Sequence, residues 1–322
     1  MNKDEVSRRD FLQTAAVGSA AAAWASVATG CAAFRPIRPD LRIIDAHVHF
    51  YDPTRPAGVP WPSRDDAFLY RPVYPAEFEK LARPLGVTSA VVVEASPWIE
   101  DNEWILELTR RHADLVGVVG HLRPGEPAFG STLVRFARKR GFRGIRIGGE
   151  AIARAGRDDA IRRDLGRLAK ENLTLDVLVG PDQLSAVASL AESLRDLRIV
   201  IDHCGNVPVN GKSPPVEWVG ALRRCALQPN LSVKVSGLVE GSGRQDGAAP
   251  RDLAFYRPVL DELWDAFGPD RVIYASNWPV SARFATYETV FRIVEEYFNA
   301  RGSGVAHRFF SDNAARIYRL QT

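Results

Sequence analysis

Eight short apolar runs alternate with longer stretches of helical periodicity from residue 43 to the end of the chain. Short runs rich in Val and Ile predict buried strands, and apolar residues at every third or fourth position predict helices. One helical stripe extends from Leu184 to Leu194, and another extends from Phe255 to Phe267 and ends at Gly268. The predicted strands are 43–48, 89–94, 115–120, 142–147, 173–179, 198–203, 231–236 and 271–276.

This alternation predicts one α/β domain, a (β/α)8 TIM barrel over residues 34–322. An open doubly wound sheet is the alternative. No strand is followed by the Gly-rich fingerprint of a dinucleotide-binding fold, which argues against that alternative. No linker or internal repeat divides the chain, so a single domain is expected.

Residues 1–33 are predicted to be a targeting leader outside the fold. The segment 7–13 (SRRDFLQ) closely matches a twin-arginine export signal, and an Ala-rich apolar run follows it. Two cleavage sites compete. The segment 28–31 (ATGC) resembles a lipobox, which would make Cys31 the lipidated residue of an exported, periplasmic or membrane-anchored lipoprotein, whereas signal peptidase would cut after Ala25.

The composition adds little to this picture. A hydrophobic share of 46%, a charged share of 25% and a net charge of +3 are typical of a globular protein. No basic run with interleaved aromatic residues is present, which argues against a nucleic-acid partner and favours a small-molecule substrate. Cys204 and Cys225 fall within predicted regular elements and are expected to be buried apolar side chains.

Polar residues end the predicted strands. The first strand ends in 45–50 (DAHVHF), where alternation places Asp45, His47 and His49 on one face. The carboxyl ends of barrel strands face one shared cavity, which is where barrel enzymes place their active sites. Alternation also turns Asp202 away from that cavity. The other candidates are Glu94, His121, Arg146, Asp176, His203, Lys234, Ser236, Asn277 and Trp278.

Each candidate has a purely structural alternative. Asp176 would serve as an ion-pair partner of Arg146 or Lys234, and Glu94 would hold one histidine of the first strand in a single tautomer. Burying such groups costs several kcal/mol each unless they are paired. Their accumulation at one end of a barrel therefore indicates a site.

Two long connections follow strand ends, at 51–71 and 237–251. Long loops at this face are usually lids or substrate walls. The alternative is a disordered surface excursion, which the four glycines of the second connection favour.

Several segments together resemble the amidohydrolase superfamily, in particular the amidohydrolase-2 branch of sugar-lactone and 2-pyrone-4,6-dicarboxylate lactone hydrolases. The matching segments are 44–53 (IDAHVHFYDP), 141–146 (GFRGIR), 201–206 (IDHCGN), 233–238 (VKVSGL), 275–280 (ASNWPV) and 312–320 (DNAARIYRL). The resemblance spans the whole mature chain. It implies that His47 and His49 contact a metal or the substrate, that His203 polarises the carbonyl, and that Arg146 and Lys234 bind anionic or hydroxylated groups.

One position departs from the family pattern. The residue after Ser276 is usually the aspartate that deprotonates the attacking water, but this chain has Asn277, and an amide is not a base. Glu94, Asp176 and His203 are the candidate replacements, in that order. The resemblance implies either no metal or one divalent ion, Zn or Mn, held by His47 and His49.

The sequence thus predicts a hydrolase that opens a sugar-acid lactone or a related cyclic ester with activated water. One alternative is a metal-dependent decarboxylase of the same superfamily. The other is a binding protein that lost the strand-eight aspartate and with it the reaction.

Overall fold

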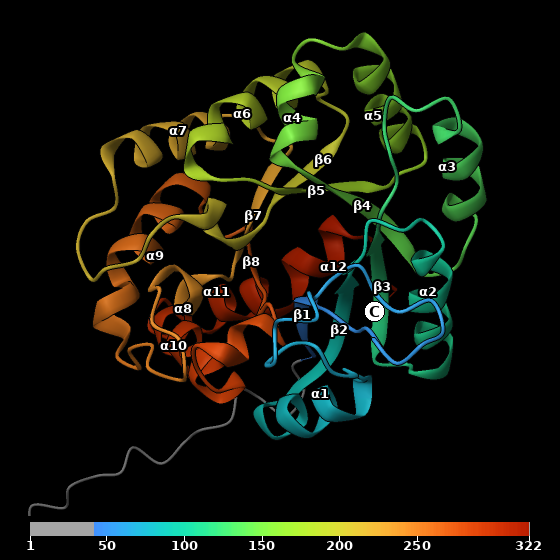
Figure 1. Ribbon diagram of the computed structural model, residues 1–322. Helices are drawn as coiled ribbons and strands as arrows, with labels where there is room; N and C mark the ends of the chain where they lie inside the picture. Colours follow the sequence, from blue (N-terminus) through green and yellow to red (C-terminus); the bar gives the residue numbers. More distant parts are fainter. Residues whose placement is uncertain (1–41, 322) are drawn as a thin grey trace, which may run out of the picture. The chain divides into compact units, whose positions relative to one another are not determined.

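Eight parallel strands form the centre of the molecule, and the computed structural model describes residues 42–321 (Figure 1). The strands are β1 (Ile43–Val48), β2 (Val87–Val93), β3 (Leu115–Gly120), β4 (Phe142–Gly148), β5 (Thr174–Leu178), β6 (Arg198–Ile201), β7 (Leu231–Val235) and β8 (Val272–Tyr274). They pair in sequence order from β1 to β8. The amide of Asn277 donates to the His47 carbonyl oxygen at 2.9 Å, which joins β8 back to β1. The (β/α)8 barrel is confirmed, and the open sheet is excluded.

Helices between the strands surround the barrel (Figure 1). They are α1 (Pro75–Ala82), α2 (Asp101–Arg111), α3 (Phe129–Ala137), α4 (Gly149–Ala155), α5 (Asp159–Lys170), α6 (Leu184–Ser193), α7 (Val216–Ala226), α8 (Leu238–Gly241), α9 (Leu253–Phe267), α10 (Tyr287–Asn299), α11 (Ser303–His307) and α12 (Asn313–Ile317). Short turns add η2 (Arg83–Leu85), η3 (Pro181–Gln183), η4 (His203–Asn206), η5 (Val280–Arg283) and the π turn η6 (Arg308–Asp312). Within residues 42–321, no helix is long and apolar enough to cross a membrane.

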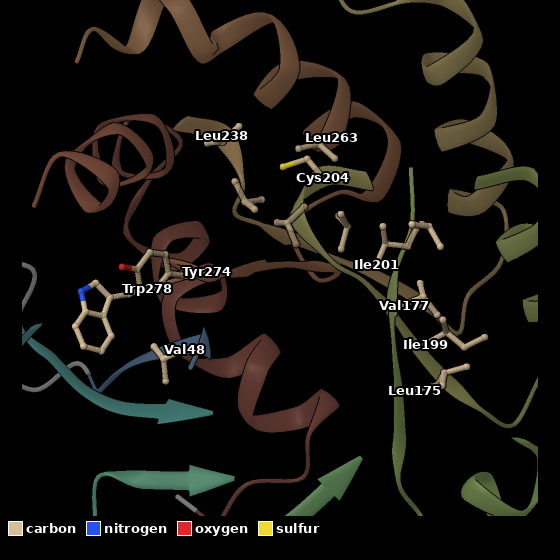
Figure 2. Packing of buried hydrophobic residues seen from close by; sticks show 14 of the residues in the cluster. Val48, Leu175, Val177, Ile199, Ile201, Cys204, Leu238, Leu263, Tyr274 and Trp278 are labelled. Atoms are coloured by element: carbon tan, nitrogen blue, oxygen red, sulfur yellow. The ribbon is translucent and has the colours of Figure 1, made fainter. Parts of the chain in front are cut away.

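The apolar core has two parts because strand side chains alternate between faces. Leu175, Val177, Ile199 and Ile201 point toward the helices and belong to the larger cluster (Figure 2). A smaller cluster consists of Ile44, Ala46, Val91, Val93, Val119, Val200, Ile273 and Ala275, together with Ala314, Ile317, Tyr318 and Leu320 from α12 and the residues after it. This smaller cluster therefore fills the part of the barrel interior next to the polar residues described below.

Strand β1 departs from simple alternation. Its register against β2 shifts between Asp45 and Val48, as a β-bulge produces. The Asp45 carboxylate accepts hydrogen bonds from the Ser276 amide at 2.9 Å and from Tyr287 of α10 at 2.9 Å. The expectation that Asp45 shares one face with His47 and His49 is therefore wrong. Asp45 fastens β1 to the end of β8 and to a helix of the outer layer.

The Gly-rich connection after β7 is ordered, contrary to the disordered excursion favoured from its glycines. It begins with helix α8, whose Leu238 and Val239 are buried. The Val209 amide donates to the Gly241 carbonyl oxygen at 2.8 Å and fixes the end of this helix. Position 240 is thereby held near the carboxyl ends of the strands.

Candidate active site

A cavity of about 410 Å³ lies at the carboxyl ends of the strands. Its lining residues include His49, Glu94, His121, Arg146, His203 and Asn277, all of them expected from the sequence, together with Trp61, Ala95, Pro97, Ile147, Gly148, Leu178 and Val280. Trp61 comes from the long connection after β1, and its ring centroid lies 5.8 Å from that of His49. That connection forms a wall of the cavity, as predicted for one of the two loops.

A buried ion cluster lies beside the cavity and is centred on Lys234. Its ammonium lies 2.5 Å from Oδ2 of Asp176, 3.0 Å from Oδ1 of Asp202 and 3.1 Å from Nδ1 of His47, and all four side chains are fully buried. Tyr318 donates a further hydrogen bond to Asp176 at 2.9 Å. The expectation that Asp202 faces away is wrong, because β6 ends at Ile201 and the chain turns Asp202 toward Lys234.

The two carboxylates of this cluster differ in proton affinity. Burial raises the pKa of Asp176 to about 6, against the attraction of the Lys234 ammonium. Burial also disfavours the charge on Asp202, but the Lys234 ammonium outweighs it and holds the pKa of Asp202 well below its usual range. Asp202 is therefore the permanent counter-ion of Lys234. Lys234, Asp176 and Ser236 are not among the cavity-lining residues, so the cluster lies behind the wall.

The hydrogen bonds of His47 and His49 define their tautomers. An ammonium only donates, so Nδ1 of His47 accepts from Lys234. Nδ1 of His49 lies 3.0 Å from the Val93 carbonyl oxygen and must donate to it. The two Nε2 atoms are 3.1 Å apart, and His47 donates to His49. Burial, reinforced by Lys234 for His47 and by Arg146 for His49, lowers the pKa of His47 well below its usual value and that of His49 to about 3.

His203 adopts a strained backbone conformation at the cavity wall. Its φ is 54°, in the left-handed region that non-glycine residues seldom adopt. Nδ1 of His203 lies 2.8 Å from Oγ of Ser236. Burial lowers the pKa of His203 to about 4, so the ring is neutral near neutral pH. When Ser236 donates to Nδ1, Nε2 of His203 carries the proton and is a neutral hydrogen-bond donor.

Glu94 and Arg146 form an ion pair that lines the cavity. Nε of Arg146 donates to Oε1 of Glu94 at 2.9 Å, and Nη2 donates to the Glu94 carbonyl oxygen at 2.8 Å. His121 lies beside them, and Asn102 holds its backbone through the His121 amide at 2.9 Å and the His121 carbonyl at 2.8 Å. Burial lowers the pKa of His121, so this wall carries one fixed ion pair and a neutral imidazole.

Glu240, which the sequence analysis did not single out, does not line the cavity but contacts Asn277, which does. Nδ2 of Asn277 donates to Oε1 of Glu240 at 2.8 Å. Oε2 is buried and has no hydrogen-bond partner in the described part of the chain. Burial raises the pKa of this carboxyl to about 7. The residue lies in a connection without periodicity, and its only sequence signal is an acidic residue four positions after the polar end of β7.

The remaining candidates have structural positions. Trp278 is buried, with its ring centroid 6.1 Å from that of Phe50 and 5.7 Å from that of Phe78, and it does not line the cavity. Cys204 and Cys225 are buried free thiols, as expected. Cys31 lies outside the described residues.

The donor atoms of the site fit a divalent cation. One donor atom each of His47, Asp202 and His203 lies within 4.8 Å of the others. The two Nε2 atoms of His47 and His49 converge, and imidazole nitrogen is a preferred ligand of Zn²⁺. Lys234 contacts Nδ1 of His47, so Nε2 carries the ring proton and would bind a cation only if that proton moved to Nδ1, which lies 3.4 Å from Oδ1 of Asp202. The Val93 carbonyl orients His49 in the way that outer partners orient metal-bound imidazoles.

Comparison with known proteins identifies two segments of the chain. Residues 44–320 match the family model described as amidohydrolase, and residues 5–23 match the model of the TAT (twin-arginine translocation) pathway signal sequence. The second match confirms the predicted export signal.

Individual relatives extend over most of the chain. An L-fucono-1,5-lactonase from Burkholderia ambifaria is 31% identical over 284 residues, which cover 86% of this chain and 95% of that protein. A 4-sulfomuconolactone hydrolase from Rhizobium radiobacter is 23% identical and covers 85% of this chain and 89% of its own length. A crystal structure of an amidohydrolase from Burkholderia multivorans with bound Zn superposes with a TM-score of 0.79 at 29% identity, covering 87% of this chain and 100% of that one.

Proposed function

This chain belongs to the amidohydrolase family, and from that premise we propose that it hydrolyses the ring ester of a hydroxylated sugar-acid lactone. The observation that carries the proposal is the composition of the cavity wall. A neutral donor, His203, faces the same cavity as the Arg146–Glu94 ion pair. The His203 donor is suited to a carbonyl oxygen, whereas Arg146 and Glu94 are suited to several hydroxyl groups.

In this proposal His203 stabilises the oxyanion. Ser236 donates to Nδ1 of His203, so that Nε2–H faces the lactone carbonyl oxygen. The bond strengthens as negative charge develops, and a neutral imidazole donates it without the cost of burying a cation. The backbone of His203 is strained, and such conformations persist only where the surroundings enforce them. The surroundings of His203 therefore also hold its ring in place.

Arg146, Glu94 and His121 bind the ring substituents. The guanidinium retains N–H donors beyond its two bonds to Glu94, and the carboxylate retains an acceptor oxygen. Together they recognise a hydroxyl group as both donor and acceptor. Trp61 also lines the cavity, and its aromatic ring suits the apolar face of a sugar ring.

His47 and His49 would hold a divalent cation through their Nε2 atoms if the Nε2 proton of His47 moved to Nδ1, where Asp202 would accept it. When bound, such a cation polarises the carbonyl group as a Lewis acid. Lys234, Asp176 and Asp202 hold the His47 ring from behind. Zinc content of the purified protein tests this assignment independently of activity. Wild type should bind one equivalent after incubation with Zn²⁺, and His47→Asn/His49→Asn should bind none.

We propose that the exported protein is anchored through a lipid on Cys31. The twin-arginine signal at residues 5–23 ends before the 28–31 (ATGC) segment, which leaves this Cys at the position where lipobox processing requires one. Mass spectrometry of the membrane fraction should find a diacylated or triacylated N-terminal Cys31. A mature N-terminus at Ser26 would show cleavage after Ala25 and remove the anchor.

A lactone panel tests the proposed function. The purified protein is assayed with a pH indicator against five- and six-membered lactones of sugar acids, with unsubstituted δ-valerolactone as the comparator. Hydrogen bonds from hydroxyl groups to charged partners contribute about 1.5–3 kcal/mol each, so kcat/KM for a sugar lactone should exceed that of the comparator by about tenfold or more. Binding of a lactone without ring opening would select the non-catalytic alternative.

A further inference from the structure

We propose that Glu240, presented by helix α8, is the general base of this site and replaces the strand-eight carboxylate that Asn277 lacks. The inference rests on the proposed lactone hydrolysis and names the residue that activates the water. The carboxylate that the family usually has after β8 is here supplied by Glu240, in the connection after β7. Asn277, after β8, donates a hydrogen bond to it.

The contact between Asn277 and Glu240 places the carboxylate directly behind a cavity-lining side chain, although Glu240 itself does not line the cavity. Asn277 lines the cavity together with His203, and its Nδ2 donates to Oε1 of Glu240 at 2.8 Å. This bond leaves Oε2 of Glu240 free, and that oxygen is buried without a hydrogen-bond partner in the described residues. A buried carboxylate oxygen without a partner is costly and therefore unusual in a structural role. As the base, Glu240 must take the proton of a cavity water through this oxygen, directly or through one further water.

The backbone around α8 holds Glu240 rigidly. Gly237, at the start of the helix, has a φ of 69° and lies so close to His203 that a Cβ atom would lie 2.6 Å from Cβ of His203. The Gly241 amide donates to the Gly237 carbonyl oxygen at 2.9 Å. The helix therefore rests directly on the residue that would stabilise the oxyanion. Base and oxyanion donor are fixed relative to each other, as catalysis by positioned groups requires.

The other carboxylates near the cavity are engaged. Oε1 of Glu94 accepts from Arg146, and Asp176 is fully buried against Lys234 and Tyr318. Glu94 and Asp176 are therefore each held in direct contact with a fixed cation. Glu240 faces an amide from the end of β8, the Cys204 thiol from η4 and the Tyr256 phenol from α9. With neutral neighbours its pKa is raised to about 7, which suits a base working near neutral pH.

The proposed step conserves atoms and charge. Glu240 removes a proton from water as the water oxygen bonds to the lactone carbonyl carbon, and the carbonyl oxygen becomes an oxyanion facing His203. Collapse of this intermediate breaks the bond between the carbonyl carbon and the ring oxygen. The proton returns from Glu240 to that ring oxygen, which leaves as a hydroxyl group, and the product is an open-chain hydroxy acid.

Glu240→Gln is the first test. Glutamine keeps an oxygen that accepts from Asn277 but is not a base, so kcat on the best lactone should fall by about 10²–10⁴-fold while KM changes little. In wild type, kcat/KM should rise with pH up to about 7, because the base must be unprotonated, and this limb should disappear in Glu240→Gln. Glu217→Gln, an exposed change on α7, is the matched control and should behave as wild type.

The double variant Glu240→Gln/Asn277→Asp exchanges carboxylate and amide across the same contact. Its kcat should be at least about tenfold higher than that of Glu240→Gln. The introduced aspartate would then be a base at the cavity wall, and the introduced glutamine would be its hydrogen-bond donor. Aspartate also tolerates the φ of 59° found at Asn277. Rescue would show that a carboxylate at this contact can act as the base, and the loss of the pH limb in Glu240→Gln would show that Glu240 is the base in wild type.

The outcomes separate the two proposals. If wild type opens no lactone, the proposed function fails. If wild type is active and Glu240→Gln keeps more than about a third of its kcat, or if the exchange variant recovers nothing while remaining folded by circular dichroism, Glu240 is not the base and the lactonase proposal stands.

Discussion

Nζ of Lys234 lies 3.1 Å from Nδ1 of His47, and this contact determines which nitrogen of the His47 ring carries its proton. The proton is on Nε2 and is donated to His49, whose own proton is donated to the Val93 carbonyl group. Asp202 and Asp176 balance the charge of the ammonium. The buried ion cluster thus fixes the ring of His47, which in turn contacts the cavity-lining His49.

Lys234→Met should destabilise the protein strongly. The substitution leaves two buried carboxylates without their cation, and breaking a buried ion pair from one side costs about 3–5 kcal/mol. Urea unfolding of wild type and variant measures the change. Lys212→Met, at an exposed position, is the control. A loss for Lys234→Met below about 1 kcal/mol would show that the cluster is not held together by this charge.

The fold was predictable because the strands are short segments rich in apolar and β-branched residues that alternate with stretches of helical periodicity. The predicted and observed strands differ by at most two residues at any end. Runs such as 115–120 are buried on both faces by the barrel interior and by the helices, so nothing local competes with their strand preference.

The residues that sequence reasoning misplaced lie where a strand stops being regular. Asp45 precedes a register shift in β1, and Asp202 follows the early end of β6, so alternation fails at both. Glu240 belongs to a short helix that is stabilised by contacts with distant residues, such as the bond between Val209 and Gly241. Contacts between segments remote in sequence have no periodic signal, and these three carboxylates could not be placed from the sequence.

Arg146→Lys should weaken substrate binding more than turnover. Lysine is a point charge and cannot reproduce the two directed bonds that orient the guanidinium on Glu94. We expect KM to rise by about tenfold or more, with a smaller change in kcat. Steady-state kinetics on the best sugar lactone measures both. Arg154→Lys, an exposed change on α4, is the control and should leave KM and kcat unchanged. An unaltered KM in Arg146→Lys would show that Arg146 does not bind the substrate.

His203→Asn should lower kcat by about 10²–10³-fold, the usual cost of removing one oxyanion donor. Asparagine is preferred to alanine for this test because it tolerates the positive φ at this position. Ser236→Ala removes only the group that selects the tautomer of His203 and should therefore cost less. If the serine variant is the more damaged of the two, His203 is not the oxyanion donor.

Glu240→Gln should stabilise the protein in a pH-dependent way. The pKa of Glu240 is raised from 4.5 to about 7, so the folded protein holds this proton more tightly than the unfolded chain does. Wild type therefore loses stability as the pH rises through that interval, and the glutamine variant does not. The free energy of unfolding of the variant should exceed that of wild type by on the order of 3 kcal/mol near pH 8, with a much smaller difference near pH 4.

Urea unfolding at the two pH values gives this difference. A gain that is equal at both would mean that the carboxyl group titrates normally in the folded protein, and would remove the reason to regard it as a base held ready near neutral pH.

The most direct test of the central claim is the fate of the oxygen atom of water. The best sugar lactone of the panel is incubated with the protein in H₂¹⁸O, and the product is followed by mass spectrometry against an enzyme-free control. Attack of water on the carbonyl carbon predicts an open-chain hydroxy acid that carries one ¹⁸O in its carboxyl group, formed well above the control rate. Lactone hydrolysis by this protein would be contradicted by a product without ¹⁸O, by release of CO₂, or by a panel in which every lactone stays intact.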